Sequence, residues 1–417
     1  MKLMPKTIED FVVNYKKKRR IEKQNRNTIN RLKNKNSPLK VFFLALDSSV
    51  WKYDSVYRLM EQSDKFDPLV LVCPIVNQSK EYMIEKLNSC YSYFSLKGYN
   101  VLKAYNENDN EYLEASSLAP DIVFYTNPYR YLIDDRYYIH QFKDSLICYV
   151  NYSYCNVPLQ YSCASEFHQT VWRYYVECND NLCQIKEYYP AKNCLVVGYP
   201  MFDQFVNNKS GIWPWKLGDK SLKRIIWAPH HSIEGNTADI AFSTFLIFHE
   251  YMLELADKYR DKVQFAFKPH SILKPALYAH PKWGKEKTDA YYARWENGYN
   301  TICIEGEYET LFTTSDAMIH DCGSFIIEYL YVNKPVMILD DSHRLSQCNV
   351  AGIKAYECHY VGIREEDIKN FIENIVINNN DLKITDRVNY YKHYLLPPYG
   401  ESVAHNIIND ILHNISK

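Results

Sequence analysis

The chain has 417 residues, of which 47% are hydrophobic and 24% charged, a composition typical of a globular protein with enough apolar mass for two domains. Its 49 Lys and Arg nearly balance its 50 Asp and Glu, so overall charge favours neither a nucleic-acid nor an acidic partner. The N-terminus lacks the apolar segment of a signal peptide, and no uncharged run is long enough to span a bilayer. We therefore expect a cytoplasmic protein.

Twelve cysteines are spread from Cys73 to Cys358, many of them within apolar runs. The closest pair, Cys178 and Cys183, has no second pair and no histidine at metal-ligand spacing. We predict reduced, buried thiols rather than disulfides or zinc ligands. We expect neither a metal nor a cofactor.

Residues 1–37 form a basic N-terminal arm, and between Lys16 and Lys35 ten Lys and Arg stand against a single Glu. One interpretation is a solvated helix. The other is a segment that binds an anionic membrane surface, where each basic residue contributes about 1 kcal/mol. In the second case the protein would be peripheral on the inner face of the cytoplasmic membrane.

Residues 38–206 alternate apolar runs with helix-like segments, the pattern of βαβ units in a parallel sheet. Strands are predicted over 39–46, 68–76, 120–128 and 144–154, and helices over 53–62 and 79–98. The segment 193–205 closes this half. We predict an N-terminal Rossmann-like acceptor domain.

A polar segment with Gly, Pro and Trp, residues 207–223, precedes a second α/β pattern, which we assign to a domain spanning 207–390. Its predicted strands lie at 224–232, 263–271, 301–306, 317–321 and 335–339, with a long helix over 242–260. Two such halves predict two Rossmann-like domains that face each other across a cleft, with a C-terminal helix in 391–417 crossing back to the first. Ligands of open α/β sheets bind at the carboxyl ends of strands.

Glycine spacing excludes the common phosphate-binding loops. The chain has 12 glycines and no two lie closer than seven positions, so neither a GxGxxG nor a Walker A pattern is present. A GxSxG elbow, an HExxH motif and a kinase signature set are also missing. A diphosphate would therefore be held by single-glycine turns and helix N-termini.

Three strand ends of the second half carry polar or ionisable groups, which converge on one edge of a parallel sheet. They are His230 and His231 after the first strand, Lys268 and His270 after the second, and Asp321, Gly323 and Ser324 after the third. Each histidine taken alone is more often structural than catalytic, but together the three turns predict an anion site. Lys268 and the histidines would neutralise charge on a departing diphosphate.

Ser324 is interpreted either as an N-cap or as a hydroxyl donor to a phosphate oxygen, at the start of an amphipathic helix. Glu328 lies one helical turn further along the same face. It either accepts hydrogen bonds from the two hydroxyls of a ribose or is a solvated helix residue.

In the first half, the turn "ALDSSVWKYDSVY" and the segment "YVNYSYCNVP" each follow a strand. The candidate residues for binding the acceptor are Ser49, Trp51, Lys52 and Tyr152. Asp54 joins His230, His231 and His270 as a candidate catalytic residue. Ordinary loop chemistry remains an equally good explanation of these two segments.

Five motifs, in this order, resemble the CDP-glycerol glycerophosphotransferase family of teichoic-acid and capsule polymerases. They are "GYPMFD", "IIWAPHHS", "FAFKPH", "SDAMIHDCGSFIIEYLYVNKPVMIL" and "YGESVAHNIINDIL". The resemblance implies a GT-B-like fold and transfer of an alditol phosphate from a CDP-activated donor to a polysaccharide or lipid-linked hydroxyl. It places the diphosphate at Gly323 and Ser324, and His270 against the diphosphate or the leaving CMP.

Two departures from the family pattern bear on the chemistry. The family's first-domain Trp-His-Gly has no counterpart, because the matching strand end, "VNYSYCNVP", lacks a histidine, and a single serine follows Gly323 where the family has two. A GT-B glycosyltransferase that uses a nucleotide sugar is therefore the alternative enzyme. A catalytically inert nucleotide-sensing or scaffold protein is the alternative outside enzymes.

Overall fold

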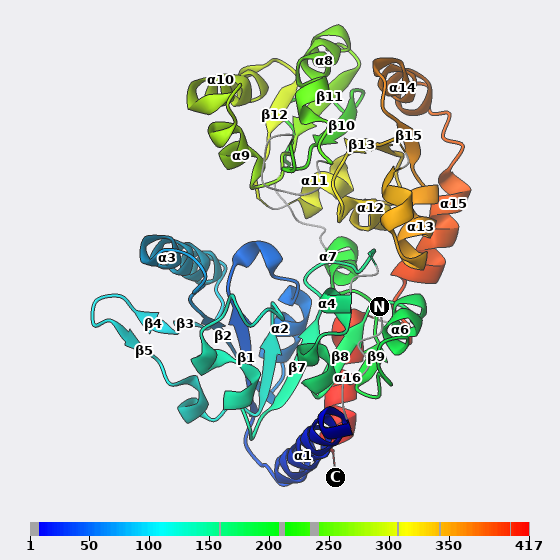
Figure 1. Ribbon diagram of the computed structural model, residues 1–417. Helices are drawn as coiled ribbons and strands as arrows, with labels where there is room; N and C mark the ends of the chain where they lie inside the picture. Colours follow the sequence, from blue (N-terminus) through cyan, green and yellow to red (C-terminus); the bar gives the residue numbers. More distant parts are fainter. Residues whose placement is uncertain are drawn as a thin grey trace. The chain divides into compact units, whose positions relative to one another are not determined.

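The computed structural model describes residues 8–157, 160–207, 213–233, 242–306, 308–341, 343–400 and 402–416. The chain divides into two compact units, each built on its own parallel sheet (Figure 1). Unit 1 contains the chain up to Asp203 and from Leu396 onward, and unit 2 contains Gln204–Leu395. The predicted fold class, two Rossmann-like α/β domains, is confirmed at the level of each unit.

Unit 1 holds a seven-stranded sheet in the order β3-β2-β1-β6-β7-β8-β9, with every neighbouring pair parallel. The strands are β1 (Leu39–Ala45), β2 (Phe66–Val72), β3 (Val101–Lys103), β6 (Ile122–Tyr125), β7 (Leu146–Val150), β8 (Arg173–Val176) and β9 (Cys194–Val196). The sequence analysis missed β3, which is very short, and β8, whose Arg-Tyr-Tyr-Val is not an apolar run.

The helices of unit 1 follow the expected pattern, as α3 illustrates. The Ser79 side chain caps its start by accepting from the Tyr82 N–H, and Met83, Leu87, Cys90 and Phe94 recur on one buried face. The helices are α1 (Ile8–Lys33), α2 (Asp54–Glu61), α3 (Lys80–Leu96), α4 (Gln160–Cys163), α5 (Glu166–Thr170), α6 (Asn179–Lys186), α7 (Met201–Asn207) and α16 (Val403–Ile415), beside a small hairpin of β4 (Tyr105–Asn106) and β5 (Glu111–Tyr112).

The basic arm is helix α1, and its C-terminal end is docked on unit 1. Arg31 forms an ion pair with the buried carboxylate of Asp121 at 2.8 Å, and Lys35 pairs with the same carboxylate. Leu32 beside them is buried. Further toward the N-terminus, basic side chains such as Lys18 and Lys23 are exposed, so this part of the helix presents positive charge to solvent.

The "GYPMFD" motif joins the C-terminal helix α16 to unit 1. Gly198 has φ +94°, and a Cβ on it would lie 2.9 Å from Cγ2 of Val403, so only glycine fits there. The Asp203 carboxylate accepts hydrogen bonds from the backbone N–H groups of Val403 (2.9 Å) and Ala404 (2.8 Å) at the first turn of α16. α16 also packs against α1 and α2 (Figure 1).

Unit 2 holds a six-stranded parallel sheet in the order β12-β11-β10-β13-β14-β15. Its strands are β10 (Lys223–Ala228), β11 (Val263–Phe267), β12 (Thr301–Cys303), β13 (Ala317–His320), β14 (Val336–Leu339) and β15 (Tyr360–Gly362). Its helices are α8 (Phe245–Lys258), α9 (Leu273–Ala279), α10 (Gly284–Asn297), α11 (Glu309–Thr314), α12 (Phe325–Glu328), α13 (Val350–Glu357), α14 (Glu365–Asn370) and α15 (Ile384–Tyr390).

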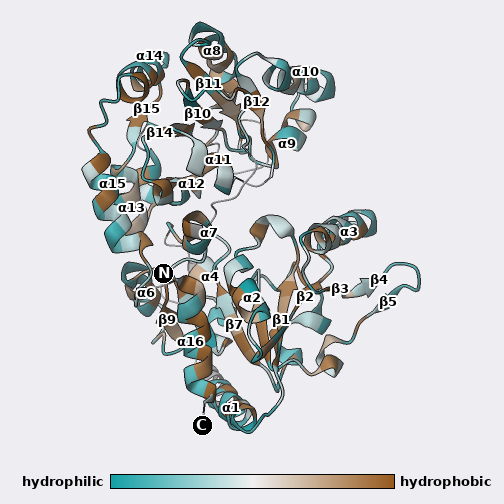
Figure 2. Ribbon diagram, turned by 180° about the vertical axis from the view of Figure 1, so that it is seen from behind, coloured by the Kyte–Doolittle hydropathy of each residue, from teal (hydrophilic) through white to brown (hydrophobic). Residues whose placement is uncertain are grey.

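Aromatic side chains fill the core of unit 2 between the sheet and α8 and α10. Trp227 stacks on Phe245 and packs against Phe267 and Trp295, and all four are buried. Apolar residues concentrate in the strands and polar residues on outer helices such as α3 (Figure 2). None of the described helices is long and apolar enough to cross a membrane.

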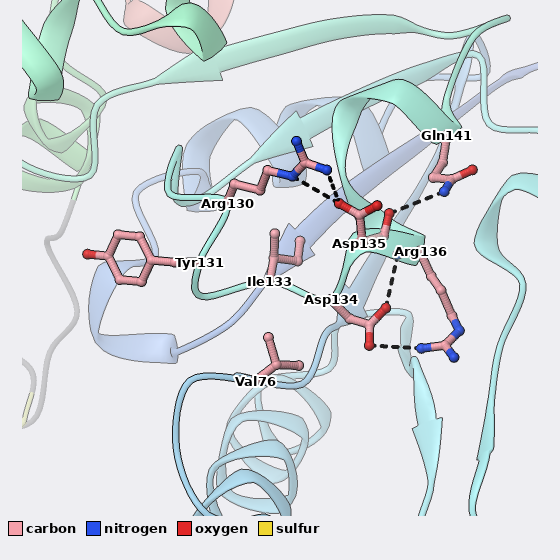
Figure 3. A pocket seen from close by; sticks show the side chains of 8 residues that line it. All are labelled: Val76, Arg130, Tyr131, Ile133, Asp134, Asp135, Arg136 and Gln141. Atoms are coloured by element: carbon pink, nitrogen blue, oxygen red, sulfur yellow. Dashed lines mark hydrogen bonds and ion pairs between the residues drawn. The ribbon is translucent and has the colours of Figure 1, made fainter.

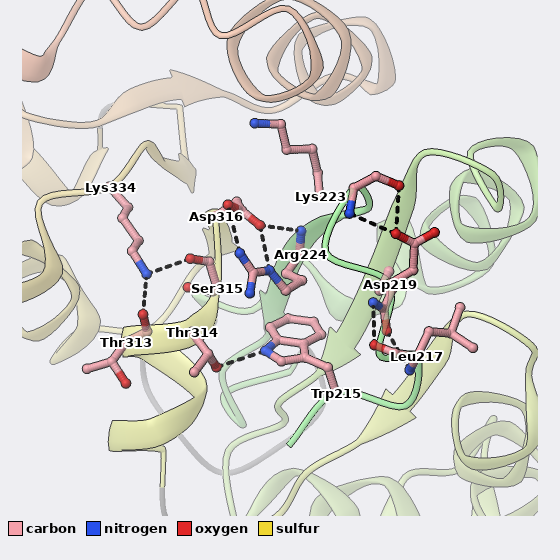
Figure 4. A network of polar contacts seen from close by, with 12 residues as sticks. Trp215, Leu217, Asp219, Lys223, Arg224, Thr313, Thr314, Ser315, Asp316 and Lys334 are labelled. Carbon is pink, nitrogen blue, oxygen red and sulfur yellow. Dashed lines mark hydrogen bonds and ion pairs between the residues drawn. The ribbon is translucent and has the colours of Figure 1, made fainter. Parts of the chain in front are cut away.

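At the amino-terminal edge of the unit 2 sheet, charged and polar side chains form several groups of hydrogen bonds and ion pairs (Figure 4). Arg224 donates from Nε to Asp316 at 2.8 Å, and the Trp215 indole N–H donates to the Thr314 hydroxyl. The Lys334 ammonium donates to the carbonyls of Phe312, Thr313 and Ser315 around the C-terminus of α11. The charged side chains at this edge therefore connect secondary-structure elements to one another.

Two expectations about individual residues can be compared directly with the structure. The predicted amphipathic helix after Ser324 is a four-residue α12 followed by a 3-10 turn, Tyr329–Val332, and is buried on almost all sides because core elements surround it. The prediction was wrong on that point. All twelve cysteines are free thiols, and most are buried, as expected.

Candidate active site

The polar residues of unit 2 gather because their strands are neighbours in the sheet. β10 lies between β11 and β13, with Trp227 opposite Phe267 and Ala228 opposite His320. All three strands are parallel, so their carboxyl ends lie side by side. This edge is opposite to the one that carries the Arg224 network.

Three histidines form a compact cluster at this edge. The ring centroids of His230 and His231 are 4.1 Å apart, those of His231 and His270 are 4.3 Å apart, and those of His230 and His270 are 5.2 Å apart. Desolvation, reinforced by neighbouring positive groups, lowers the pKa of His230 to about 2 and that of His270 to about 4. Burial also lowers the pKa of His231. All three rings are therefore neutral at pH 7.

Lys268 supplies the positive charge next to these neutral rings. Its side chain is buried, and its Nζ makes neither a hydrogen bond nor an ion pair with the part of the chain that the structure describes. Nζ lies 5.9 Å from the ring centroid of Tyr308. Desolvation lowers the pKa of this ammonium. The charges of Glu305 and Glu309 act in the opposite direction, but neither forms an ion pair with Lys268. An anion at this edge would give the buried ammonium a closer counter-charge.

Asp321 has a different role from the one that the sequence analysis gave it. The carboxylate is fully buried and accepts hydrogen bonds from the backbone N–H of His230, the backbone N–H of Thr244 and the Thr244 hydroxyl. Burial raises its pKa, while Arg344 and these bonds act in the opposite direction. Asp321 thus ties the turn after β10 to the start of α8, which makes it a positioning residue for the histidines.

The turn at Gly323 and Ser324 is partly exposed. A Cβ built on Gly323 would meet no atom within 4 Å, so the space above this turn is open. Ser324 occupies the N-cap position of α12 with helical φ of −70° and makes no side-chain capping bond. Ser324 therefore stands at the predicted N-cap position without capping through its side chain, and its hydroxyl is left for the other predicted role, a donor to a phosphate oxygen.

Glu328 lies one turn after Ser324, and its backbone N–H donates to the Ser324 carbonyl at 3.1 Å. The side chain is only 2% exposed, and its carboxylate accepts the hydroxyl proton of Tyr308. Glu328 is therefore not a solvated helix residue. A ribose hydroxyl would have to displace Tyr308 to reach it.

Arg344, in the turn after β14, was not identified from the sequence. Its guanidinium is buried over the Phe242 ring at 4.4 Å, and Nη2 donates to the Phe242 carbonyl at 3.2 Å. Its positive charge lowers the pKa values of His230 and Asp321. The sequence signal that could have identified Arg344 is a basic residue in the loop after the predicted strand at 335–339.

The first-half candidates divide between core and surface positions. Trp51 is buried in an aromatic cluster with Phe43 and Phe94, and its indole N–H donates to the Tyr99 hydroxyl at 3.2 Å. The structure thus places Trp51 in the core of unit 1 rather than on an acceptor surface. Lys52 beside it is buried as well.

The other three candidates retain some exposure. Ser49 is exposed in the turn after β1, and the Asp54 carboxylate accepts from Tyr99 and lies 3.9 Å from Arg58. Tyr152 follows β7, which is separated from β1 by β6, and lines a cavity of about 130 Å³. Within unit 1, the structure therefore does not gather these residues into one cluster.

A larger cavity of unit 1, about 580 Å³, lies beside the segment 130–141 (Figure 3). Its charges pair with each other, Arg130 with Asp135 at 2.7 Å and Arg136 with Asp134 at 2.8 Å. It therefore offers little unpaired charge to a phosphate.

Comparison with known proteins agrees with the sequence resemblance. The family model described as CDP-glycerol:poly(glycerophosphate) glycerophosphotransferase matches residues 164–347, which include the histidine cluster, Lys268 and the Gly323 turn. No curated protein sequence matches the chain.

Solved structures with low sequence identity share the fold. The wall teichoic acid polymerase TagF is similar with a TM-score of 0.57 and 12% identity, over 96% of this chain and 94% of that one. UDP-GlcNAc 2-epimerase from Neisseria meningitidis, bound to UDP-GlcNAc, has a TM-score of 0.51 and 16% identity over 90% and 100% of the chains. The Methanocaldococcus jannaschii epimerase has a TM-score of 0.52 and 13% identity, over 90% and 99%.

With sequence identities of 12–16%, the solved structures establish the fold alone. The family model relates residues 164–347 to its family. Residues 164–347 are thus similar to the CDP-glycerol:poly(glycerophosphate) glycerophosphotransferase family, and this similarity supports a glycerophosphotransferase-like transferase.

Proposed function

We propose that the protein transfers a glycerol phosphate, or a related alditol phosphate, from a CDP-activated donor to a hydroxyl of a cell-surface polysaccharide or lipid-linked acceptor. The observation that carries this proposal is the buried Lys268, which has no ion-pair partner among the described residues, beside three neutral histidines. These residues lie at adjacent strand ends within the region that the family model matches. An anion of high charge density suits such a site because it supplies the missing counter-charge.

In the proposed reaction the acceptor hydroxyl attacks the phosphorus attached to the alditol. A new P–O bond forms to the acceptor, the bond to the bridging oxygen breaks, and CMP leaves with that oxygen. Lys268 would stabilise the charge that develops on the leaving phosphate. The hydroxyl proton goes to a base, for which neutral imidazoles such as His270 are candidates, since a bound phosphate raises the pKa of an adjacent ring.

A nucleotide-sugar glycosyltransferase remains the second candidate. The strand end after β7 has Asn151 and Tyr152 where the family's catalytic histidine was expected, and the similar epimerase structure is described as bound to UDP-GlcNAc. This alternative predicts release of a UDP-type nucleotide and no phosphodiester in the product.

Association with a membrane is a further part of the proposal. The exposed basic side chains of α1 would bind anionic lipid on the cytoplasmic face and bring the active site to a lipid-linked acceptor. Truncating α1 would also remove the Arg31–Asp121 pair, so glutamate substitutions at Lys18 and Lys23 give a cleaner test. Binding to anionic vesicles should fall in the variant and in high salt, and unchanged binding would refute this part.

The main test incubates the protein with CDP-glycerol, CDP-ribitol and UDP-sugars and measures which nucleotide is released. We expect CMP from a CDP-alditol, with release reduced by roughly 100-fold or more in His270→Ala. His413→Gln, an exposed site on α16, is the control and should behave like the wild type. Release of UDP, or CMP release that is insensitive to His270→Ala, would overturn the proposal.

A further inference from the structure

We propose that His230, His231 and His270 form a binding site for a divalent transition-metal ion, with Zn²⁺ as the best-suited ion. This goes beyond the proposed function, because it concerns what the three rings bind in the absence of any nucleotide donor.

The geometry of the cluster carries the inference. One ring nitrogen from each histidine can be chosen so that all three lie within 4.8 Å of one another. Zinc bonds imidazole nitrogen at about 2.0–2.1 Å, which places the ligands of a tetrahedral site about 3.4 Å apart. Side-chain rotations that bring each ring inward by roughly 1 Å would close the site.

The surroundings of the rings fit metal ligation. Nδ1 of His230 lies 2.8 Å from the Ser232 hydroxyl and accepts a 3.3 Å hydrogen bond from the Ser232 N–H. These contacts fix the ring, and Nε2 can bind a metal once its proton leaves or moves to Nδ1. Nδ1 of His231 is buried and has no hydrogen-bond partner in the described part of the chain. A metal would give this orphaned nitrogen a partner, or would take Nε2 and leave Nδ1 as the donor.

His270 needs the same change of protonation as His230. Its Nδ1 accepts a 3.2 Å hydrogen bond from the Ile272 N–H, which keeps the proton on Nε2. Coordination through Nε2 requires that proton to leave or to move to Nδ1, and the long contact with Ile272 to be given up. The bond is weak, so this change is small compared with a metal–imidazole bond.

The ligand set indicates the class of ion. Three imidazoles without a carboxylate suit Zn²⁺, Co²⁺ or Ni²⁺ and disfavour Mg²⁺ and Ca²⁺, which prefer oxygen. Three protein ligands also leave a fourth position for water or a substrate oxygen, as in catalytic rather than structural zinc sites. The three residues come from two adjacent strand ends, which are joined by a 3.1 Å hydrogen bond from the His270 N–H to the Pro229 carbonyl.

The test measures metal binding alone. Full-length protein without a histidine tag is dialysed against Zn²⁺ or Co²⁺, bound metal is quantified, and the visible absorption of the Co²⁺ form is recorded. We expect one equivalent per chain and an absorption spectrum of a four-coordinate ion. His230→Gln, His231→Gln and His270→Gln should each weaken binding by about 100-fold or more, given that even second-shell changes cost 10- to 100-fold. His413→Gln should have no effect.

Circular dichroism and thermal unfolding establish that each variant is folded, and a variant that fails to fold is replaced by its asparagine counterpart. Binding of less than one equivalent would overturn the inference. Binding that persists in all three variants would overturn it as well and would indicate adventitious chelation at the surface. Neither outcome refutes the proposed transfer reaction, whose readout is the released nucleotide. A metal bound through His270 would leave the role of base to another group.

Discussion

Lys268 and Lys334 lie at opposite edges of the same sheet and show how differently one residue type is used. Lys334 precedes β14 at the amino-terminal edge, where its ammonium donates to three carbonyls (Figure 4). Lys268 follows β11 at the carboxyl edge, where its buried ammonium has no hydrogen-bond or ion-pair partner among the described residues.

The two aspartates that flank β13 differ in the same way. Asp316 pairs with Arg224 at the amino-terminal edge, while the Asp321 carboxylate accepts hydrogen bonds from backbone N–H groups. Asp321 forms no ion pair with Lys268. The difference teaches that burial of charge does not by itself mark a site. A buried charge that has no partner within the protein does indicate a binding site, because its desolvation is tolerated only where a ligand offsets it.

The largest effect should come from Lys268→Met. We expect the kcat/KM for transfer to fall by about 100- to 1,000-fold, because a preorganised positive charge at the leaving phosphate is lost. The free energy of unfolding should stay the same or rise, since an unpaired buried ammonium is removed. Nucleotide release and chemical denaturation measure the two quantities. If Lys268→Met kept its activity, the proposed difference between Lys268, which serves the reaction, and Lys334, which serves stability, would be refuted.

Asp321→Asn should affect stability and activity together. The amide retains one acceptor for the three donors it faces, so we expect the free energy of unfolding to fall by up to about 3 kcal/mol. Activity should fall as well, because the turn that carries His230 loses its anchor. Thr244→Val removes only the hydroxyl donor and serves as the milder comparison. Unchanged stability in Asp321→Asn would contradict the positioning role.

Lys334→Met should reverse the outcome of Lys268→Met. Three carbonyls lose a charged donor, and we expect a loss of about 1–2 kcal/mol in the free energy of unfolding. Transfer activity should stay within about twofold of the wild type at a temperature well below unfolding, since this edge carries no part of the candidate site. Urea denaturation and nucleotide release check both expectations. A large drop in kcat with normal stability would mean that the two edges are coupled.

The smallest effect concerns pH. Burial lowers the pKa of Lys334 to about 8, whereas an unfolded lysine titrates near 10.4. Between these values the unfolded chain binds more protons than the folded chain, so the Lys334 contribution to stability rises with pH above about 8. The difference in unfolding free energy between wild type and Lys334→Met should therefore increase from pH 7.5 to about pH 9.5. Parallel pH profiles of the two proteins would argue that the ammonium stays protonated.

Much of the fold could be predicted because it depends on local patterns. Apolar runs such as Leu39–Ala45 and Val336–Leu339 became central parallel strands, and α3 shows the helical spacing of buried residues that its sequence implies. The short strands β3 and β8 escaped prediction because pairing with neighbouring strands, rather than composition, makes them strands.

By itself the sequence determined that His230, His270 and Asp321 follow strands, because strand periodicity and turn residues are encoded locally. Only the tertiary structure decided that β10 lies between β11 and β13, so that these residues meet. It also decided which charges are satisfied: Asp321 by backbone N–H groups, Glu328 by Tyr308, and Lys268 by no described partner. The pairing of charges depends on residues far apart in the chain, and burial determines how much an unpaired charge costs. Neither the pairing nor the burial can be predicted from local sequence.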